Sequence, residues 1–436
     1  MLPAHQRVWT NRNLRMATIE AVGFDMDHTL ALYNSATFEQ LCFELAIDNL
    51  INVKGYPEEI RSISYDRKAV ARGLIIDKRH GNIIKVDTHG YVARVRHGGK
   101  LLSREERRKY YKRGRIRLSP KRYRVVDTLF DLPEGSLYTE LVTLKDSQPK
   151  LLKVSFRVLF DDIRNSIDTI HRDGSLKETI VAEIPKYFKR DDLLSKTLDK
   201  FRSAGKKLFL LTNSDYSYTC AVMNFILSSK TKNWEEYFDL VVCSAQKPGY
   251  FLESGKGTKI NGSKCNCFSG GDAFFLESKV GSLGDQILYF GDHTYGDILR
   301  SKKSVGWRTA MIVPEVETEV LAAEPVSRSI RALEETQAMI EELSLEKDHL
   351  LEIGEDTVEI QQQIESSLSR RAVLRKRIAS IYNPYWGSIF REGRVPSRFG
   401  GQIRDVACIY TSRVSNLSHY SAHKFFASVV EQMPHE

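Results

Sequence analysis

Cysteine and long apolar runs are both scarce in this sequence. Six of the 436 residues are cysteine, and no run approaches the roughly 18 consecutive apolar residues of a membrane helix. No N-terminal segment has the apolar length of a signal peptide. The one close cysteine pair, Cys265 and Cys267, lacks the second pair that a structural zinc site needs. We therefore expect a soluble, cytoplasmic protein with free thiols and no membrane partner.

The charge balance is basic, with a formal net charge of +9, and 42% of the residues are hydrophobic. A chain of this length and composition can build a sizeable core, in two structural units. The basic run 104–124 is compatible with nucleic-acid binding, but no nucleic-acid fold motif accompanies it. Such runs are more often a solvated face or a site for small anions, so we predict no nucleic-acid partner.

Two carboxylates stand one residue apart behind an apolar run. Asp25 and Asp27 follow the segment 19–24, which has the composition of a buried strand. The loop after such a strand in an α/β sheet lies at the crevice where ligands bind. Alternation along an extended chain points both side chains the same way, so one can attack a phosphorus atom while the other handles the proton. The alternative is an Asp-rich turn with a capping Thr29.

The string Asp25-Met-Asp-His-Thr29 resembles the signature of the haloacid dehalogenase superfamily, most of whose members transfer phosphoryl groups through an aspartyl-phosphate. The resemblance predicts three further motifs, each behind a strand-like run. They are found in order as Thr212, Asn213 and Ser214 behind 208–211, Lys247 behind 239–243, and Asp292 with Asp297 behind 287–290. We therefore expect an α/β fold with a Rossmann-like parallel sheet of the haloacid dehalogenase type.

This resemblance implies a role for each motif residue. Asp25 is the expected nucleophile and Asp27 the general acid and base. Mg²⁺, a hard cation that prefers oxygen ligands, is the expected cofactor. Its ligands would be the carboxylates of Asp25 and Asp292 and the backbone carbonyl of Asp27, with Asp297 in support. The expected phosphate-binding groups are the Met26 amide, Thr212, Asn213, Ser214 and Lys247.

The spacing of the motifs defines the domain organisation. About 180 residues separate Asp25 from Thr212, far more than one crossover connection needs, so we expect an inserted cap. We assign residues 1–35 and 190–380 to the catalytic core, 36–189 to an α+β cap interleaved with core elements, and 381–436 to a segment that packs on the core.

Local patterns predict individual elements within these parts. Strands are expected at 74–77, 81–87 and 91–95, and a helix at 162–171. The Gly- and Ser-rich stretch 253–271 is typical of a mobile hairpin or loop. The charge-dense stretch 315–380, with spaced Leu and Ile, predicts long amphipathic helices that form a hairpin.

A narrower resemblance extends over nearly the whole chain. It is similar to the cytosolic purine 5'-nucleotidases in the segments 23–33, 55–57, 72–74, 81–87, 128–134, 174–177, 212–216, 291–293 and 433–436. Members of that family hydrolyse purine nucleoside 5'-monophosphates, chiefly IMP and GMP, and many pass the phosphoryl group to a nucleoside acceptor. The resemblance also implies a homo-oligomer, either a dimer or a tetramer.

The same resemblance places the base-binding residues. They fall on Phe130, Arg164, Asp168, His171 and Lys177, with the purine between the rings of Phe130 and His171. The spacing i, i+4, i+7 puts three of them on one helix face. The alternative for Arg164 and Asp168 is an exposed ion pair without a binding role.

Two positions depart from the family pattern. His28 stands where animal members have Tyr, and Asp127 stands where the effector pocket of those members has Asn, which makes activation by nucleotides doubtful. Two other functions stay open. A sugar phosphatase of the same superfamily would keep the catalytic motifs without using the base-binding row. A non-catalytic interaction protein would use the helices of 315–380 as its surface.

Overall fold

The computed structural model describes all residues except 1, 113, 230, 264–265 and 430–436. The motif at 433–436 and the thiol of Cys265 lie outside the described residues. Within the described part of the chain, no helix combines the length and apolarity that crossing a bilayer requires.

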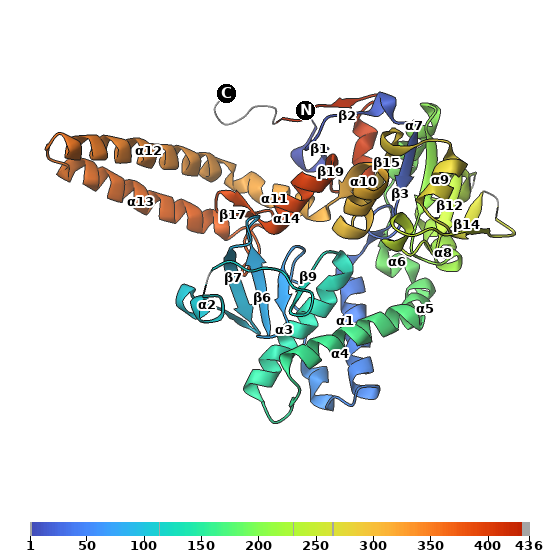
Figure 1. Ribbon diagram of the computed structural model, residues 1–436, viewed down its shortest axis with the longest axis horizontal. Helices are drawn as coiled ribbons and strands as arrows, with labels where there is room; N and C mark the ends of the chain where they lie inside the picture. Colours follow the sequence, from blue (N-terminus) through green and yellow to red (C-terminus); the bar gives the residue numbers. More distant parts are fainter. Residues whose placement is uncertain (1, 113, 230, 264–265, 430–436) are drawn as a thin grey trace.

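A nine-stranded sheet organises the described chain (Figure 1). Its order is β1 (Trp9–Thr10), β19 (Ile409–Thr411), β16 (Arg308–Ile312), β15 (Ile287–Gly291), β3 (Ala21–Phe24), β11 (Lys207–Leu211), β12 (Leu240–Cys243), β14 (Cys267–Gly270) and β13 (Gly257–Lys259). The pairings are parallel from β19 to β14, and only the edge strands β1 and β13 run antiparallel to their neighbours. The expected α/β fold with a parallel core is therefore confirmed.

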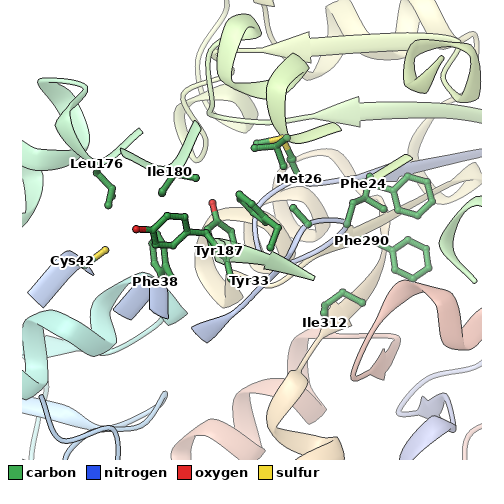
Figure 2. Packing of buried hydrophobic residues seen from close by; sticks show 14 of the residues in the cluster. Phe24, Met26, Tyr33, Phe38, Cys42, Leu176, Ile180, Tyr187, Phe290 and Ile312 are labelled. Atoms are coloured by element: carbon green, nitrogen blue, oxygen red, sulfur yellow. The ribbon is translucent and has the colours of Figure 1, made fainter. Parts of the chain in front are cut away.

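Strand β3 lies at the centre of the sheet, and all four of its residues are buried. Its Phe24 ring stacks on Phe290 of β15 with the centroids 5.2 Å apart, and both rings belong to the main core (Figure 2). Parallel neighbours β11 and β15 flank β3, so the carboxyl ends of all three strands meet at one edge of the sheet. That edge is where ligands bind in open α/β sheets.

The inserted segment forms a second sheet covered by helices. The antiparallel order is β8 (Lys100–Leu101), β7 (Val92–His97), β6 (Asn82–Val86), β5 (Ile75–Asp77) and β9 (Tyr123–Val125). The same part of the chain contains the helices α1 (Ser35–Asn52), α3 (Leu132–Ser147), α4 (Phe156–Arg172) and α5 (Ser175–Ala182). The three predicted strands are present. Helix α4 begins six residues earlier than predicted, since the Ser155 hydroxyl accepts a hydrogen bond from the Val158 amide and caps it.

The stretch 253–271 contains a hairpin, as predicted, because β13 and β14 pair antiparallel, but the hairpin is also part of the main sheet, which was not predicted. Strand β14 extends the parallel sheet beside β12, and β13 closes the edge. Cys267 and Phe268 at the start of β14 are buried. The Gly and Ser content of the flanking residues obscured this short apolar pair.

The predicted helices of 315–380 are present as α11 (Pro314–Ala323), α12 (Ser327–Glu352) and α13 (Val358–Ala379). Helices α12 and α13 form an antiparallel hairpin that projects from the body of the molecule (Figure 1). The C-terminal segment adds α14 (Arg398–Val406) and β19, the latter inside the main sheet. The division into core, cap and C-terminal segment stays a prediction.

Shorter elements complete the described chain. They are α2 (Arg104–Tyr110), α6 (Ile184–Tyr187), α7 (Leu194–Ser203), α8 (Tyr216–Leu227), α9 (Ala273–Val280), α10 (Arg300–Val305), β2 (Leu14–Arg15), β4 (Leu32–Tyr33), β10 (Phe188–Lys189), β17 (Arg391–Glu392), β18 (Val395–Pro396) and β20 (Phe425–Phe426).

Candidate active site

The four motifs meet at the carboxyl edge of the main sheet around one ammonium group. The Nζ atom of Lys247 lies 2.9 Å from an Asp25 carboxylate oxygen and 2.7 Å from an Asp297 oxygen. It also donates to the Tyr289 hydroxyl and to the carbonyl of Leu211. Because these partners come from strands β3, β11 and β15 or the loops after them, Lys247 joins all three strands at the site.

Negative charge exceeds positive charge among these buried groups. Burial raises the pKa of Asp25 well above its usual range, Lys247 opposes the rise, and the carboxylates of Asp297, Asp27 and Asp292 add to it. Burial lowers the pKa of Lys247, but the two carboxylates beside it outweigh this and raise it overall. Lys247 is therefore a permanent cation that faces more than one carboxylate.

Three of these carboxylates form a cluster suited to a hard cation. Asp25, Asp292 and Asp297 each offer an oxygen, and the three oxygens lie within 4.8 Å of one another. Asp292 is 2% exposed, and its Oδ2 has no hydrogen-bond partner among the described residues. Burial, followed by the charge of Asp297, raises the pKa of Asp292 to about 8. A buried carboxylate oxygen without a donor fits a metal ligand.

A π-helical turn places Asp297 in this cluster. The turn Thr294–Leu299 begins at His293, whose Nδ1 accepts hydrogen bonds from the amides of Tyr295 and Gly296. Such turns are rare and concentrate at functional sites. Gly291 allows the close approach, because a Cβ atom there would lie 2.5 Å from the Cβ of Asp297.

Asp27 is oriented by two hydroxyl groups. Tyr33 donates to its Oδ1 over 2.7 Å, and Ser214 donates to its Oδ2 over 2.9 Å. Burial raises the pKa of Asp27, while both hydroxyl donors oppose the rise. Asp27 is therefore more readily protonated than an exposed aspartate and is held in one orientation, as a general acid and base requires.

The expected phosphate-binding groups lie at the same edge, and each of them has a hydrogen-bond partner within the protein. The Thr212 hydroxyl accepts from the Ser214 amide. The Asn213 side chain donates to the Lys247 carbonyl and accepts from its amide, so it joins the two loops. The Met26 amide donates to the Asp25 carboxylate. Their roles toward phosphate remain predictions.

The expected base-binding row has buried acidic partners. Arg164 contacts Asp168 at 2.9 Å on its own helix, as the spacing predicted. It also contacts Glu134 at 2.8 Å and Asp131 at 3.2 Å, and both of these acids are buried. Burial raises the pKa of Glu134 to about 7 although Arg164 opposes it. Arg164, whose side chain is 33% exposed, is therefore held by two buried acids in addition to Asp168, which a simple surface pair would not require.

The two expected aromatic faces touch each other. The rings of Phe130 and His171 are perpendicular, with centroids 5.7 Å apart. A purine stacked between parallel rings needs about twice the 3.5–4.0 Å contact distance, so this arrangement is not an open slot. His28 also packs edge-on against Phe130 at 4.6 Å. It is buried in the left-handed conformation, and burial followed by the charge of Arg72 lowers its pKa to about 3.

Among the expected base-binding residues, Lys177 contacts the loop that carries the second motif. Its ammonium group donates to Asp215, the residue after Ser214, and lies 5.2 Å from the ring of Tyr218. Its charge also lowers the pKa of Asp27 slightly against the larger effect of burial. The residue thus connects the cap to the second motif.

Arg72 lies beside the site, and no role was predicted for it from the sequence. It lies in the cap segment, is 1% exposed, and donates to both oxygens of Glu315. Its third bond, over 2.8 Å, goes to the backbone carbonyl of Asp292. Arg72 therefore fixes the backbone that carries the Asp292 carboxylate. The segment 72–74 resembles the family, but its partners lie more than 200 residues away in the chain.

We expect Arg72→Met to lower the free energy of unfolding by about 3–5 kcal/mol, because it leaves Glu315 without its buried partner. The double variant Arg72→Met with Glu315→Met should recover most of this loss. Urea unfolding followed by circular dichroism measures both. Equal stability of the single variant and the wild type would contradict the role of the pair.

Comparison with known proteins finds relatives over nearly the whole chain. A model of the 5' nucleotidase family matches residues 8–436. A 5'-nucleotidase domain-containing protein of Dictyostelium discoideum is 28% identical over 460 residues, covering 99% of this chain and 75% of that protein.

Solved structures of phosphate-handling enzymes also align. A predicted phosphoglycolate phosphatase of Haemophilus somnus has a TM-score of 0.31 and 13% identity over 68% of this chain and 87% of its own. A β-phosphoglucomutase of Pyrococcus has a TM-score of 0.33 and 11% identity over 67% and 86%. The haloacid dehalogenase-type fold rests on the strand order and motifs described above rather than on these alignments. The family match extends over nearly the whole chain, and the protein belongs to the 5' nucleotidase family.

Proposed function

We propose that this enzyme is a Mg²⁺-dependent nucleotidase that hydrolyses purine nucleoside 5'-monophosphates, IMP and GMP in preference, through an aspartyl-phosphate on Asp25. The observation that carries the proposal is the buried contact of Asp25 with Lys247 beside Asp292 and Asp297. Family membership supports a phosphatase acting on nucleotides. The purine preference and the metal are the further steps proposed here.

The chemistry follows from the positions of Asp25 and Asp27. A carboxylate oxygen of Asp25 attacks phosphorus, and the bond from phosphorus to the 5'-oxygen breaks. Asp27, held by Tyr33 and Ser214, gives its proton to that oxygen. It then takes a proton from water, which attacks phosphorus and breaks the bond to Asp25. Lys247 offsets the negative charge of the phosphoryl oxygens throughout.

The carboxylates of Asp25, Asp292 and Asp297 would hold Mg²⁺, as their clustered oxygens and the unpartnered Asp292 Oδ2 support. The Asp27 carbonyl is a further proposed ligand. The bound ion would supply positive charge that draws the phosphate dianion toward the Asp25 carboxylate and stabilises the transition state.

Selectivity for 6-oxopurines is assigned to Arg164, Asp168, His171, Lys177 and Phe130. The ion pairs of Arg164 support this role, because they orient a donor and an acceptor on helix α4. A donor or acceptor that faces the wrong edge of a base is left without a hydrogen-bond partner, which costs about 1–3 kcal/mol. A nucleoside that replaces water as the acceptor would make the enzyme a phosphotransferase.

Substitution of the two motif carboxylates tests the mechanism. Asp25→Asn should remove turnover of IMP, because it removes the nucleophile. Asp27→Asn should lower kcat by about 10²–10⁴-fold, since general acid and base catalysis is lost. Phosphate release measures both, with the exposed Asp285→Asn as a matched control. Hydrolysis by Asp25→Asn near the wild-type rate would rule out the covalent route.

Loss of a ligand tests the metal site separately from catalysis. Asp292→Asn should weaken Mg²⁺ binding by at least about 100-fold, because changes even to residues that support metal ligands cost 10–100-fold. Isothermal titration with MgCl₂ in the absence of substrate measures the affinity. Asp285→Asn should bind Mg²⁺ like the wild type, and unchanged binding by Asp292→Asn would place the metal elsewhere.

The base-binding row is tested by a ratio of substrates. Asp168→Ala should lower the ratio of kcat/KM for IMP over AMP by about 5–150-fold, which corresponds to about 1–3 kcal/mol. Arg157→Ala, at the opposite end of the same helix, is the matched control and should leave the ratio unchanged. An unaltered ratio in Asp168→Ala would assign selectivity to other residues, and activity confined to sugar phosphates would favour the alternative phosphatase.

A further inference from the structure

The five-stranded sheet and its helices form a recess with basic walls, which the proposed catalytic function does not use. Its volume is about 600 Å³, within the range of roughly 300–1,000 Å³ that small-molecule sites have. Six of the eight residues that line it are Lys or Arg, and none is acidic. The lining residues of this basic recess are Lys78, Arg79, Lys121, Arg122, Lys145, Ser155, Phe156 and Arg157.

One wall of the basic recess lies at the end of two paired strands. Strands β5 and β9 run antiparallel, so residues 78–79, which follow β5, lie beside residues 121–122, which precede β9. The Lys78 amide donates to the Arg122 carbonyl over 2.9 Å. The pairing of the backbone therefore brings four basic side chains together, two of which come from the basic run 104–124.

Another wall is the connection between α3 and α4. Lys145, near the end of α3, donates to the Leu152 carbonyl over 2.8 Å and lies 5.8 Å from the centre of the Phe156 ring. Helix α4 begins here, where the Ser155 hydroxyl accepts a hydrogen bond from the Val158 amide. The other amides of the first turn and the dipole of this 17-residue helix favour an anion at this end.

Two carboxylates offset part of the positive charge. Arg122 donates twice to the buried Asp77. Asp161 lies 3.7 Å from Lys78 and 3.7 Å from Arg157. Within the described part of the chain these are the ion pairs of the lining side chains, so six cations face two carboxylates and the recess keeps a net charge of +4.

The excess charge belongs to side chains without an acidic partner. Arg79, Lys121 and Lys145 form no ion pair with any residue that the structure describes. Neighbouring cations repel one another, and an anion that enters the recess relieves this repulsion. A phosphate monoester carries a charge of about −1.5 to −2 at pH 7. One phosphate group would therefore leave about half of the excess, whereas two or three groups would balance it.

The basic recess lies away from both parts of the proposed active site. Helix α4 starts at the recess, and on it Arg157 precedes His171 by 14 residues, which corresponds to about 21 Å. Strand β5 begins three residues after Arg72, which contacts the Asp292 carbonyl, and it ends at the recess. A ligand in the recess would therefore not occupy the position of a nucleotide at the catalytic edge.

We propose that the basic recess binds a small soluble molecule that carries at least two phosphate groups. The guanidinium groups of Arg79 and Arg157 can donate in pairs to phosphate oxygens, and the Lys ammonium groups supply further charge. The side chain of Lys78 is 13% exposed, and a partly buried cation attracts an anion more strongly than a fully solvated one does. Because the cations surround one concavity, the recess fits a compact anion better than the extended backbone of a nucleic acid.

Isothermal titration with sodium tripolyphosphate tests this site. In buffer that contains EDTA, the wild type should bind one equivalent. The double variant Arg79→Gln with Lys121→Gln should bind at least about 10-fold more weakly, because it removes two charge-assisted contacts. The matched control is Arg375→Gln with Lys376→Gln on α13. It removes the same two residue types from exposed positions and should keep the wild-type affinity.

The carboxylate beside the recess gives a test of opposite sign. Asp161→Asn should strengthen tripolyphosphate binding by about threefold, because it removes a negative charge beside Lys78 and Arg157. The exposed Asp285→Asn makes the same change in net charge and should not alter the affinity. Sodium phosphate should bind the wild type at least about 10-fold more weakly than tripolyphosphate, because one phosphate group leaves part of the charge unbalanced.

Thermal unfolding provides a second measurement. Tripolyphosphate should raise the Tm of the wild type and of the Arg375→Gln, Lys376→Gln control, but not that of the Arg79→Gln, Lys121→Gln variant, because a ligand that binds only the folded state stabilises it. Circular dichroism checks that each variant is folded. Neither measurement contains Mg²⁺ or a nucleotide, so the result is independent of the proposed nucleotidase activity.

Any of three outcomes would overturn the proposal. The first is that the variant of Arg79 and Lys121 binds tripolyphosphate like the wild type, or that its control loses as much affinity. The second is that phosphate binds as tightly as tripolyphosphate. The third is that a 20-nucleotide RNA binds the wild type more tightly than tripolyphosphate and is lost in the same variant, which would assign the recess to nucleic acid.

Discussion

The contact between Lys247 and the buried carboxylates is the interaction on which the rest of the site depends. One ammonium group faces Asp25 and Asp297 directly, with Asp27 and Asp292 close enough to affect the same titration. Buried carboxylates repel one another and lose their hydration, and both effects favour the protonated form. Lys247 opposes this effect, and so it favours the ionised form of the neighbouring carboxylates even without substrate. The negative charge that Lys247 does not offset would favour the divalent cation proposed above.

The fold explains why these charges can be held together. Strands β3, β11 and β15 are packed side by side with apolar residues on both faces, so the loops at their ends have fixed spacing. Tyr289 extends from β15 beneath Lys247 and donates to the carbonyl of Leu211 and to Asp297. The buried aromatic layer, which includes Phe209 and Trp307, supports it from below. The rigid apolar layer beneath the site therefore keeps the closely spaced polar groups at the edge of the sheet in position.

Much of this site could be predicted from the sequence, because each motif is a short string behind an apolar run. The parallel sheet, the three strands predicted between residues 74 and 95, and the helical hairpin were all expected and are present. The pairing of β14 with β12 in the parallel sheet was not expected, because a Gly- and Ser-rich composition hides Cys267 and Phe268. The contacts of Arg72 with Glu315, and of Arg164 with Glu134, also could not be derived. Each contact joins segments that are distant in the chain or differ in periodicity. The pattern of residues within one segment does not show which distant segment it will contact.

The bonds of Arg72 bear on how a nucleotide reaches the site. Arg72 belongs to the cap insertion, whereas Glu315 and the Asp292 carbonyl belong to the core. Swinging the whole insertion away from the sheet would expose a buried guanidinium and separate it from three acceptors at once. Rigid-body opening at this corner is therefore disfavoured.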